Sequence, residues 1–260
     1  MQFLEIFIYS LIQGITEFLP ISSSAHLYFL DELFKWKGQG VLYALAAHLG
    51  TLIAVIYYKK KYIFSLFKNI LIFKDELKYF VCIFVSCIPV IIIGAIISLF
   101  FEDIYDSILL IIGTACILGG ILLDFADKYK EKEKVNTEVT YKISFLVGFF
   151  QILALIPGMS RSGTVITALR MCYINRQESI KFSILTGIPI LFIASFYSLY
   201  TLSNTDSSIT YKFFTISIIS FFSALLSIKF IVFWVNRYSF RFFSLYRIIL
   251  GLAIYFYLII

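Results

Sequence analysis

Two short polar segments interrupt an otherwise apolar chain, and their side chains are of the kinds that handle phosphate. The first, Gln13 to His26 (QGITEFLPISSSAH), holds an amide, a carboxylate, three hydroxyls and an imidazole. The second, Pro157 to Thr167 (PGMSRSGTVIT), holds an arginine between two serines. Such groups are costly in apolar surroundings, so we expect both segments to be functional. Together they predict one phosphate-handling site built from two halves.

The first segment predicts an acidic group beside a capped helix. Gln13 and Glu17 are four residues apart, so they share one face of a short helix. Pro20 ends that helix, and the run Ser22–Ser24 is suited to cap the next one. Free N–H groups at a capped helix start bind anions. His26 falls in the first turn of this second helix, close to any anion bound there.

The second segment supplies positive charge. Arg161 is always protonated and offers paired donors to phosphate oxygens. Ser160, Ser162 and the N–H groups after Gly158 can form a second anion-binding nest.

The two segments are not chemically equivalent. Counted from the prolines, Glu17 lies three residues before Pro20, whereas the apolar Ala154 lies three before Pro157. The second segment also lacks a histidine. We therefore expect one half to bring acid, base and metal ligand, and the other half to bring the cation.

Composition places the elements that carry these segments in a membrane. Of 260 residues, 60% are hydrophobic and only 15% are charged, whereas soluble domains are about one quarter charged. The net charge of +6 comes from basic residues in short loops, where they set topology, so we expect no nucleic-acid partner. The four cysteines lie in apolar segments without metal-ligand spacing and predict buried free thiols.

Six segments have the length and apolarity of membrane-spanning helices, which need about 20 residues. Two further segments, about 1–30 and 140–173, are broken in the middle and predict re-entrant pairs of half-helices surrounded by protein or a water-filled cavity. The spans are expected at about 41–58, 77–100, 107–124, 179–201, 211–232 and 243–260. The sequence thus predicts an all-α polytopic membrane protein with six transmembrane helices and two re-entrant helix hairpins.

A re-entrant pair followed by three spans occurs twice. Because three is odd, the second pair must enter from the opposite face, which predicts an inverted-topology repeat. The two repeats, about 1–125 and 140–260, form a single membrane domain joined by a charged, solvated linker, Asp124–Lys142, to which we assign no chemistry. A pattern shared by Ser86–Phe100 and Thr186–Tyr200, with Ile-Pro followed by Ser-Leu-aromatic, gives the repeat modest support.

Basic residues orient this topology. Most lysines and arginines, Arg170 and Arg247 among them, fall on one side, and only Lys35, Lys37 and Lys212 fall on the other. The positive-inside rule makes the basic side cytoplasmic. Both termini and the mouth of the first hairpin then face outward, and the second hairpin enters from the cytoplasm. The N-terminus lacks the basic region of a cleavable signal peptide and is expected to stay in the mature protein.

The two segments, with HLGTL at His48–Leu52 between them, resemble the undecaprenyl-diphosphate phosphatase family, membrane enzymes also called bacitracin-resistance proteins. The resemblance covers nearly the whole chain in element order. It implies an inverted-repeat fold in the bacterial plasma (inner) membrane and removal of the terminal phosphate from undecaprenyl diphosphate. This reaction recycles the lipid carrier of cell-wall synthesis. Dependence on a divalent cation, Mg²⁺ or Ca²⁺, is implied as well.

The resemblance also implies roles for individual residues. The expected catalytic residues are Glu17, His26, Arg161 and Ser23, the expected substrate-binding residues are Ser22, Ser24, Gly158, Ser160 and Ser162, and the expected metal ligands are Glu17 and Gln13. Gln13 stands where many members have glutamate, which removes one negative charge from a metal site. Thr164-Val165 replaces a small residue followed by threonine, so either Thr164 or Thr167 can be the helping hydroxyl. We expect His48 to pack rather than to act.

These assignments predict hydrolysis of a polyprenyl diphosphate. Arg161 and the helix after Pro20 would hold phosphate oxygens, and His26 would act as general base or acid. The nucleophile stays open between Ser23, His26 and water, and the oligomeric state stays open, with a homodimer as one option.

Two other functions fit parts of the pattern. A lipid-carrier transporter or flippase would share the inverted repeats and broken helices, but it would release no phosphate. Acid-phosphatase-like lipid phosphatases need a second histidine after the arginine, and TVITALRMCYINRQ contains none.

Overall fold

The computed structural model describes residues 3–36, 40–69, 74–100, 108–129, 138–202 and 207–259, and these form ten α-helices and a short 3-10 helix. Within these ranges there is no β-strand. The elements are α1 (Phe3–Phe18), α2 (Ser23–Phe34), α3 (Gly40–Asn69), α4 (Lys74–Phe100), α5 (Ile108–Tyr129), α6 (Tyr141–Ile152), η1 (Leu153–Leu155), α7 (Arg161–Met171), α8 (Arg176–Leu202), α9 (Ser207–Val235) and α10 (Arg241–Ile259).

The order of helices agrees in part with the sequence prediction. Each broken segment is a pair of short helices joined by a turn: α1 and α2 form the first hairpin, and α6 and α7 form the second hairpin. Among the described residues, five helices are long and apolar enough to cross a membrane, which makes the chain an all-helical, multi-pass membrane protein. Helix α3, where a sixth span is expected, is not among the five. The five candidate spans are Glu76–Ile97, Ile108–Lys128, Arg176–Phe196, Tyr211–Val235 and Arg241–Ile259.

Helix α9 supports both the first hairpin and α3. Helices α1 and α3 pack along it, and small residues allow the close approach that is common between membrane helices. A Cβ added at Gly14 would lie 1.9 Å from Ser223 Oγ, and one added at Gly50 would lie 2.2 Å from the Ser217 carbonyl oxygen. Because α1 and α3 are fixed to the same helix, their polar side chains can meet.

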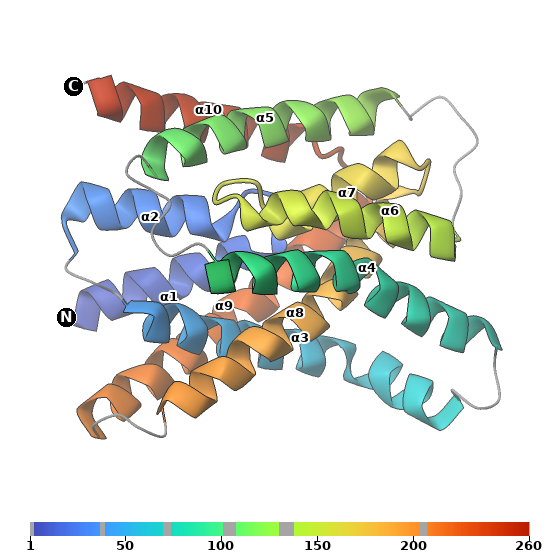
Figure 1. The fold of residues 1–260 in the computed structure, drawn as a ribbon, viewed down its shortest axis with the longest axis horizontal. Helices are drawn as coiled ribbons and strands as arrows, with labels where there is room; N and C mark the ends of the chain where they lie inside the picture. The colour runs from blue at the N-terminus through green and yellow to red at the C-terminus, as the bar shows by residue number, and fades with distance from the viewer. Residues whose placement is uncertain are drawn as a thin grey trace.

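Some helix contacts recur when the two halves of the chain are exchanged. Helix α1 packs on α9, and its counterpart α6 packs on α4. Helices α5 and α10 lie side by side at one edge of the molecule, and both termini lie at the same end (Figure 1). Where α5 meets α10, a Cβ on Gly251 would lie 2.6 Å from the Gly113 carbonyl oxygen, and one on Gly113 would lie 3.3 Å from that of Gly251.

The Ile-Pro match in the sequence does not relate equivalent helices. Ser86–Phe100 belongs to α4, which is the fourth helix of its half, whereas Thr186–Tyr200 belongs to α8, the third helix of its half. The shared pattern therefore reflects two apolar helices of similar composition rather than the repeat.

The expected linker Asp124–Lys142 was wrong at both ends. Helix α5 continues to Tyr129, and α6 begins at Tyr141. Residues 130–137 lie outside the described residues, as does Lys37 of the charge count.

Asp127, which falls within that expected linker, is buried and ties four helices together. It is 2% exposed and accepts hydrogen bonds from Arg170 Nε at 2.9 Å, from Arg176 Nη2 at 2.9 Å and from the Phe240 backbone N–H at 2.9 Å. Arg170 is therefore the partner of a buried carboxylate, and its expected place in a basic loop was wrong. The cluster joins α5 to α7, to the start of α8 and to the turn before α10.

Candidate functional site

The two hairpins turn into their second helices with the same backbone geometry. Ser22 caps α2 and Ser160 caps α7, and each side-chain oxygen accepts a hydrogen bond from the backbone N–H three residues later, at 3.3 and 3.1 Å. Their φ and ψ angles are 71° and 100° for Ser22 and 65° and 112° for Ser160. Serine rarely adopts a positive φ, and such strain gathers at functional sites.

The matching Ser22 and Ser160 caps change the alignment of the two hairpins, which was counted from Pro20 and Pro157 in the sequence. If Ser22 corresponds to Ser160, then Pro20 corresponds to Gly158, and Glu17 corresponds to Leu155 rather than to Ala154. Leucine and alanine are both apolar, so the chemical asymmetry of the two hairpins remains.

The two turns are hydrogen-bonded to each other. Ser162 Oγ donates to the Leu19 carbonyl oxygen at 2.8 Å, and the Gly158 backbone N–H donates to Ser24 Oγ at 3.3 Å. Segments far apart in the sequence therefore form one centre, as two halves of a single site require.

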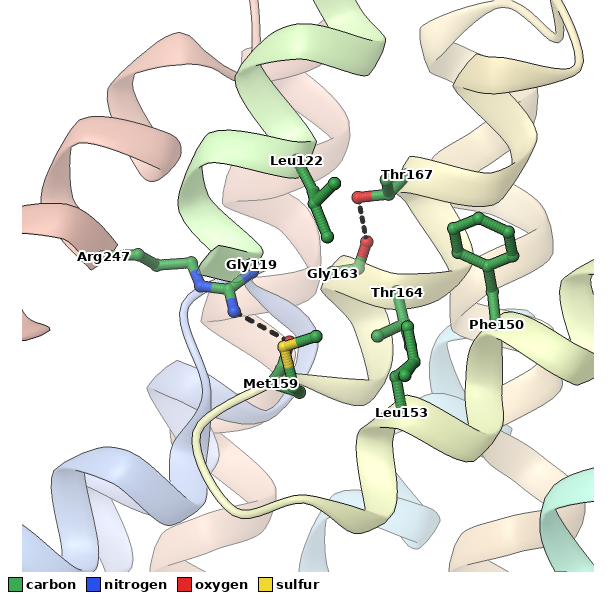
Figure 2. Close-up of a pocket in the computed structure, with 9 residues that line it drawn as sticks. All are labelled: Gly119, Leu122, Phe150, Leu153, Met159, Gly163, Thr164, Thr167 and Arg247. Atoms are coloured by element: carbon green, nitrogen blue, oxygen red, sulfur yellow. Dashed lines mark hydrogen bonds between the residues drawn. The ribbon is translucent and has the colours of Figure 1, made fainter. Parts of the chain in front are cut away.

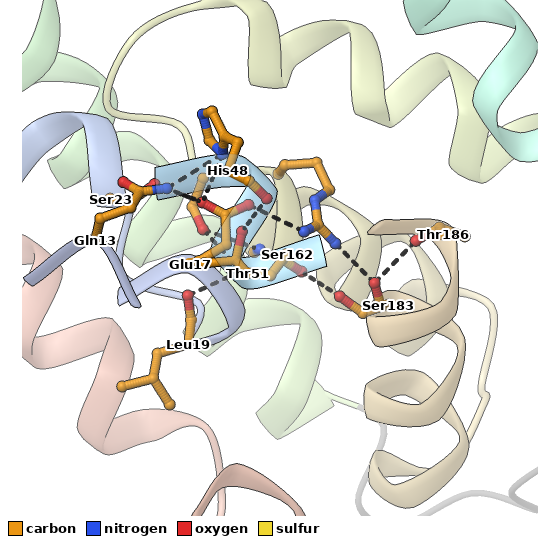
Figure 3. A network of polar contacts seen from close by, with 12 residues as sticks. Gln13, Glu17, Leu19, Ser23, His48, Thr51, Ser162, Ser183 and Thr186 are labelled. Atoms are coloured by element: carbon orange, nitrogen blue, oxygen red, sulfur yellow. Dashed lines mark hydrogen bonds and ion pairs between the residues drawn. The ribbon is translucent and has the colours of Figure 1, made fainter. Parts of the chain in front are cut away.

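Glu17 lies at this centre and contacts the first residue of both capped helices (Figure 3). Its Oε2 accepts hydrogen bonds from Gln13 Nε2 at 2.8 Å and from Ser23 Oγ at 3.1 Å. Its Oε1 accepts one from Arg161 Nη2 at 3.2 Å. The carboxylate is 9% exposed, so charge and hydrogen bonding are strong here. Three of the residues selected from sequence thus converge on the Glu17 carboxylate.

Helix α8 holds the arginine in place. Arg161 Nη1 donates to the Ser183 carbonyl oxygen at 2.7 Å, and the guanidinium lies 6.0 Å from the centre of the Phe18 ring. Gly187 makes room for it, because a Cβ there would lie 2.8 Å from Nη2. Arg161 is therefore oriented by backbone and ring, while Nη2 faces the carboxylate.

His48, which was expected to pack rather than to act, lies in the same cluster and makes a polar contact with α1. Its Nδ1 lies 3.2 Å from Gln13 Nε2 and 3.8 Å from Glu17 Oε2. Sequence reasoning missed this contact because it depends on α1 and α3 both packing on α9. The sequence feature that could have indicated this contact was the string HLGTL, His48–Leu52.

His26 faces away from Glu17, toward α10. Its Nδ1 lies 2.7 Å from the Ser22 carbonyl oxygen, and its Nε2 lies 2.7 Å from the Tyr246 hydroxyl. A carbonyl only accepts hydrogen bonds, so Nδ1 carries the hydrogen and donates. The ring stacks on Tyr246 with centroids 5.5 Å apart. His26 thus lies at the rim of the first hairpin rather than beside the carboxylate.

The remaining hydroxyls are partly occupied by local bonds. Thr164 Oγ1 donates to the Arg161 carbonyl oxygen and Thr167 Oγ1 donates to that of Gly163, both at 2.8 Å. Neither threonine is singled out by these contacts, so the choice between them stays open. The hydroxyls of Ser22 and Ser24 are 3.1 Å apart, and those of Ser160 and Ser162 are 3.1 Å apart as well.

One further polar residue near the site escaped the sequence analysis. Arg247, counted there among the basic residues that set topology, is 1% exposed in α10 and hydrogen-bonded to the second turn. An arginine within an apolar run, YRIILGLAIYF, was the signal that charge counting overlooked.

Comparison with known proteins matches the chain to one family over most of its length. Residues 6–253 fit the model of the family described as bacitracin resistance protein BacA. A protein of Pelagibacter ubique named undecaprenyl-diphosphatase is 34% identical over 253 residues, covering 97% of this chain and 96% of that protein. Two further proteins have the same name. The one from Saccharophagus degradans is 36% identical over 252 residues, which cover 95% of this chain and 94% of that protein. The one from Campylobacter curvus is 35% identical over 265 residues, which cover 98% of this chain and 99% of that protein.

Proposed function

The chain belongs to the bacitracin resistance protein BacA family, and we propose that it is the membrane phosphatase that hydrolyses undecaprenyl diphosphate to undecaprenyl phosphate and inorganic phosphate. The observation that carries the proposal is the convergence on Glu17 of Ser23 and Arg161, the first residues of α2 and α7. A carboxylate, a hydroxyl and a guanidinium in one buried centre are the parts that phosphoryl transfer needs. The reaction returns the lipid carrier to cell-wall synthesis, and bacitracin resistance follows from it.

The diphosphate is held at the junction of the two hairpins. Two capped helix starts bring backbone N–H groups and positive dipole ends to one place. Arg161 adds a full positive charge and a paired set of donors. The serines Ser22, Ser24, Ser160 and Ser162, with the Gly158 backbone, line this junction and serve as substrate-binding groups. Developing charge on the phosphoryl oxygens is offset by these fixed donors.

Ser23 is the nucleophile in this proposal. Its hydroxyl donates to Glu17 at 3.1 Å, so the proton has an acceptor in place. Ser23 Oγ bonds to the terminal phosphorus, the bond from that phosphorus to the bridging oxygen breaks, and undecaprenyl phosphate leaves with the bridging oxygen. The hydroxyl proton passes to Glu17. Water then hydrolyses the phosphoserine to free Ser23 and inorganic phosphate.

The two histidines have different roles. His26 has its hydrogen on Nδ1, so Nε2 is the nitrogen that accepts a proton, and it faces Tyr246. It acts as general base or acid at the rim of the first hairpin. His48 Nδ1 lies 3.2 Å from the Gln13 amide nitrogen and accepts its hydrogen bond, which helps to hold Gln13 beside Glu17.

We propose a divalent cation, Mg²⁺ or Ca²⁺, as cofactor, which Glu17 and the Gln13 amide oxygen would hold. Hard cations take oxygen ligands, and Mg²⁺ commonly binds one or two carboxylates plus substrate phosphates. Among the described residues there is no group of three or more His, Cys, Asp or Glu side chains that could hold a metal ion. When bound, the ion neutralises phosphate charge.

The proposed membrane fold consists of two inverted repeats, about 1–125 and 140–260, with six spans and two re-entrant hairpins. Support comes from the matching caps of α2 and α7, from the helix contacts that recur in the two halves and from both termini lying at one end (Figure 1). The lysines that end α3 make its end cytoplasmic. Both termini then face outward from the bacterial plasma membrane.

Phosphate release from purified full-length protein tests the function. We expect inorganic phosphate from undecaprenyl diphosphate in detergent, and loss of about 10³-fold or more in kcat for Glu17→Gln. The matched control is Glu138→Gln, which changes an exposed carboxylate paired with Lys78. No phosphate from the folded wild-type protein would contradict hydrolysis and favour a lipid-carrier flippase.

Chemical trapping tests the nucleophile. Rapid acid quench of protein mixed with substrate labelled in the terminal phosphate should leave acid-stable label on Ser23, because phosphoserine survives acid. Acid-labile label on histidine, or incorporation of solvent oxygen without protein label, would replace Ser23 by His26 or by water.

A further inference from the structure

Arg247 is a buried cation that has no carboxylate partner among the described residues. It is 1% exposed and is the largest of the fully buried side chains among the described residues. Its Nη2 donates to three backbone carbonyl oxygens, those of Met159 at 2.8 Å, Gly158 at 3.1 Å and Ala115 at 3.3 Å. Its Nε has no hydrogen-bond partner within the described part of the chain.

Stability alone does not account for this arrangement. A buried charge is expensive, and apolar residues of similar volume commonly replace buried charges without loss of stability. The chain nevertheless keeps space for the guanidinium. A Cβ at Gly119 would lie 1.9 Å from Nη2, and one at Gly163 would lie 2.9 Å from Nη1. Figure 2 shows Arg247 reaching past Gly119 to Met159, with Gly163 on its other side.

The carbonyls that Arg247 holds belong to the turn that leads into the site. Gly158 has a φ of 99°, and Met159 precedes the strained cap Ser160 and then Arg161. Irregular backbone inside a membrane protein needs donors for its carbonyl oxygens. Arg247 supplies them and joins this turn to α5 through Ala115.

The space beside Arg247 excludes direct binding of a phosphate. The cavity lined by Arg247, Thr164 and Thr167 has a volume of about 10 Å³, which is room for about one water molecule. Arg247 therefore acts on the site through the turn and not by touching the substrate.

We propose that Arg247 is a positioning residue: by holding the Gly158 and Met159 carbonyls it fixes the start of α7, and with it the approach of Arg161 to Glu17 and the substrate. The proposal rests on the phosphatase function given above. A displacement of a reacting group by about 1 Å costs up to about 10²-fold in rate, so loss of this hold should appear mainly in kcat.

Arg247→Met in the full-length protein tests the role, because methionine keeps apolar bulk and removes the donors. We expect kcat for undecaprenyl diphosphate to fall about 10- to 10²-fold, with KM within about threefold. The unfolding temperature should also fall, because three buried carbonyl oxygens lose their donor. Arg241→Met, an exposed arginine at the start of the same helix, is the matched control and should match wild type.

Arg247→Lys keeps the positive charge but loses the planar guanidinium group, and it should retain more activity than Arg247→Met. If Arg247→Met does not fold, this variant carries the test, with kcat between wild type and inactive protein at normal unfolding temperature. A wild-type kcat in either folded variant overturns the proposal, and so does a rise in KM without a change in kcat, which would mean direct substrate contact. An inactive wild-type protein would instead contradict the phosphatase function.

Discussion

The two hairpins share a backbone and differ in chemistry. A single constant shift along the chain relates Ser22 to Ser160, and the same shift relates Gly113 to Gly251. Both cap serines have a positive φ, both accept from an N–H three residues later, and both lie 3.1 Å from a second hydroxyl. The frame is thus common to both hairpins, and function must come from the positions at which they differ.

Those differences lie at the start of the capped helices. Ser23 in the first hairpin stands where the second has Arg161, so one frame presents a hydroxyl and the other a cation to the same carboxylate. The shift also places Arg247 opposite Leu109. Leu109 lies in an apolar cluster with Ala25, whereas Arg247 lies against a glycine. The second hairpin is thus held by polar contacts where the first is held by apolar packing.

The largest effect should come from the hydroxyl that only the first hairpin presents to Glu17. Ser23→Ala removes the proposed nucleophile, and we expect kcat to fall by about 10³-fold or more. Ser24→Ala, one residue away, removes an acceptor of the Gly158 N–H and should cost less than about tenfold, as a weakened hydrogen bond would. Phosphate release by both purified variants measures the contrast. Equal losses would mean that Ser23 serves only to bind.

A smaller loss is expected where the second hairpin presents its cation. Arg161→Lys keeps the charge but replaces the planar guanidinium, which donates to Ser183 and Glu17 from two nitrogens, by a single ammonium nitrogen. We expect kcat to fall about 10²-fold. Arg237→Lys, at an exposed arginine over Phe233, is the control. Full activity in Arg161→Lys would show that a positive charge alone suffices for catalysis and that an oriented guanidinium is not needed.

Sequence alone could predict the hairpins and their asymmetry, because both are local. A proline break, a serine cap and an i, i+4 pair are set by neighbouring residues, and the bond between Gln13 and Glu17 bears this out. His48 and Arg247 could not be placed, because their contacts depend on which helices pack together. Charge counting treated Arg247 as a surface residue, and only the two glycines that surround it reveal its place.

Gln13 and Gln151 occupy equivalent positions in the two hairpins, and comparing them tests whether Gln13 binds metal or only stabilises the structure. The constant shift relates Gln13, beside Glu17, to Gln151, whose amide donates to the Ser86 carbonyl oxygen. Gln13→Glu adds a carboxylate to the proposed metal ligands, so the Mg²⁺ concentration for half-maximal phosphate release should fall about tenfold. Gln151→Met should leave it unchanged. A chelator titration of the three proteins gives the comparison, and an unaltered Mg²⁺ requirement in Gln13→Glu would remove Gln13 from the metal site.

The smallest effects should be equal in the two hairpins, because they concern the shared frame. Ser22→Ala and Ser160→Ala lose the cap but keep the positive φ, and each should lower the unfolding free energy by about 1 kcal/mol. Ser22→Gly and Ser160→Gly also lose the cap but relieve the backbone strain, so each should stay within about 0.5 kcal/mol of wild type. Equilibrium unfolding in mixed micelles measures all four. If alanine and glycine ranked differently in the two hairpins, the caps would not be equivalent, and the common frame would be limited to backbone shape.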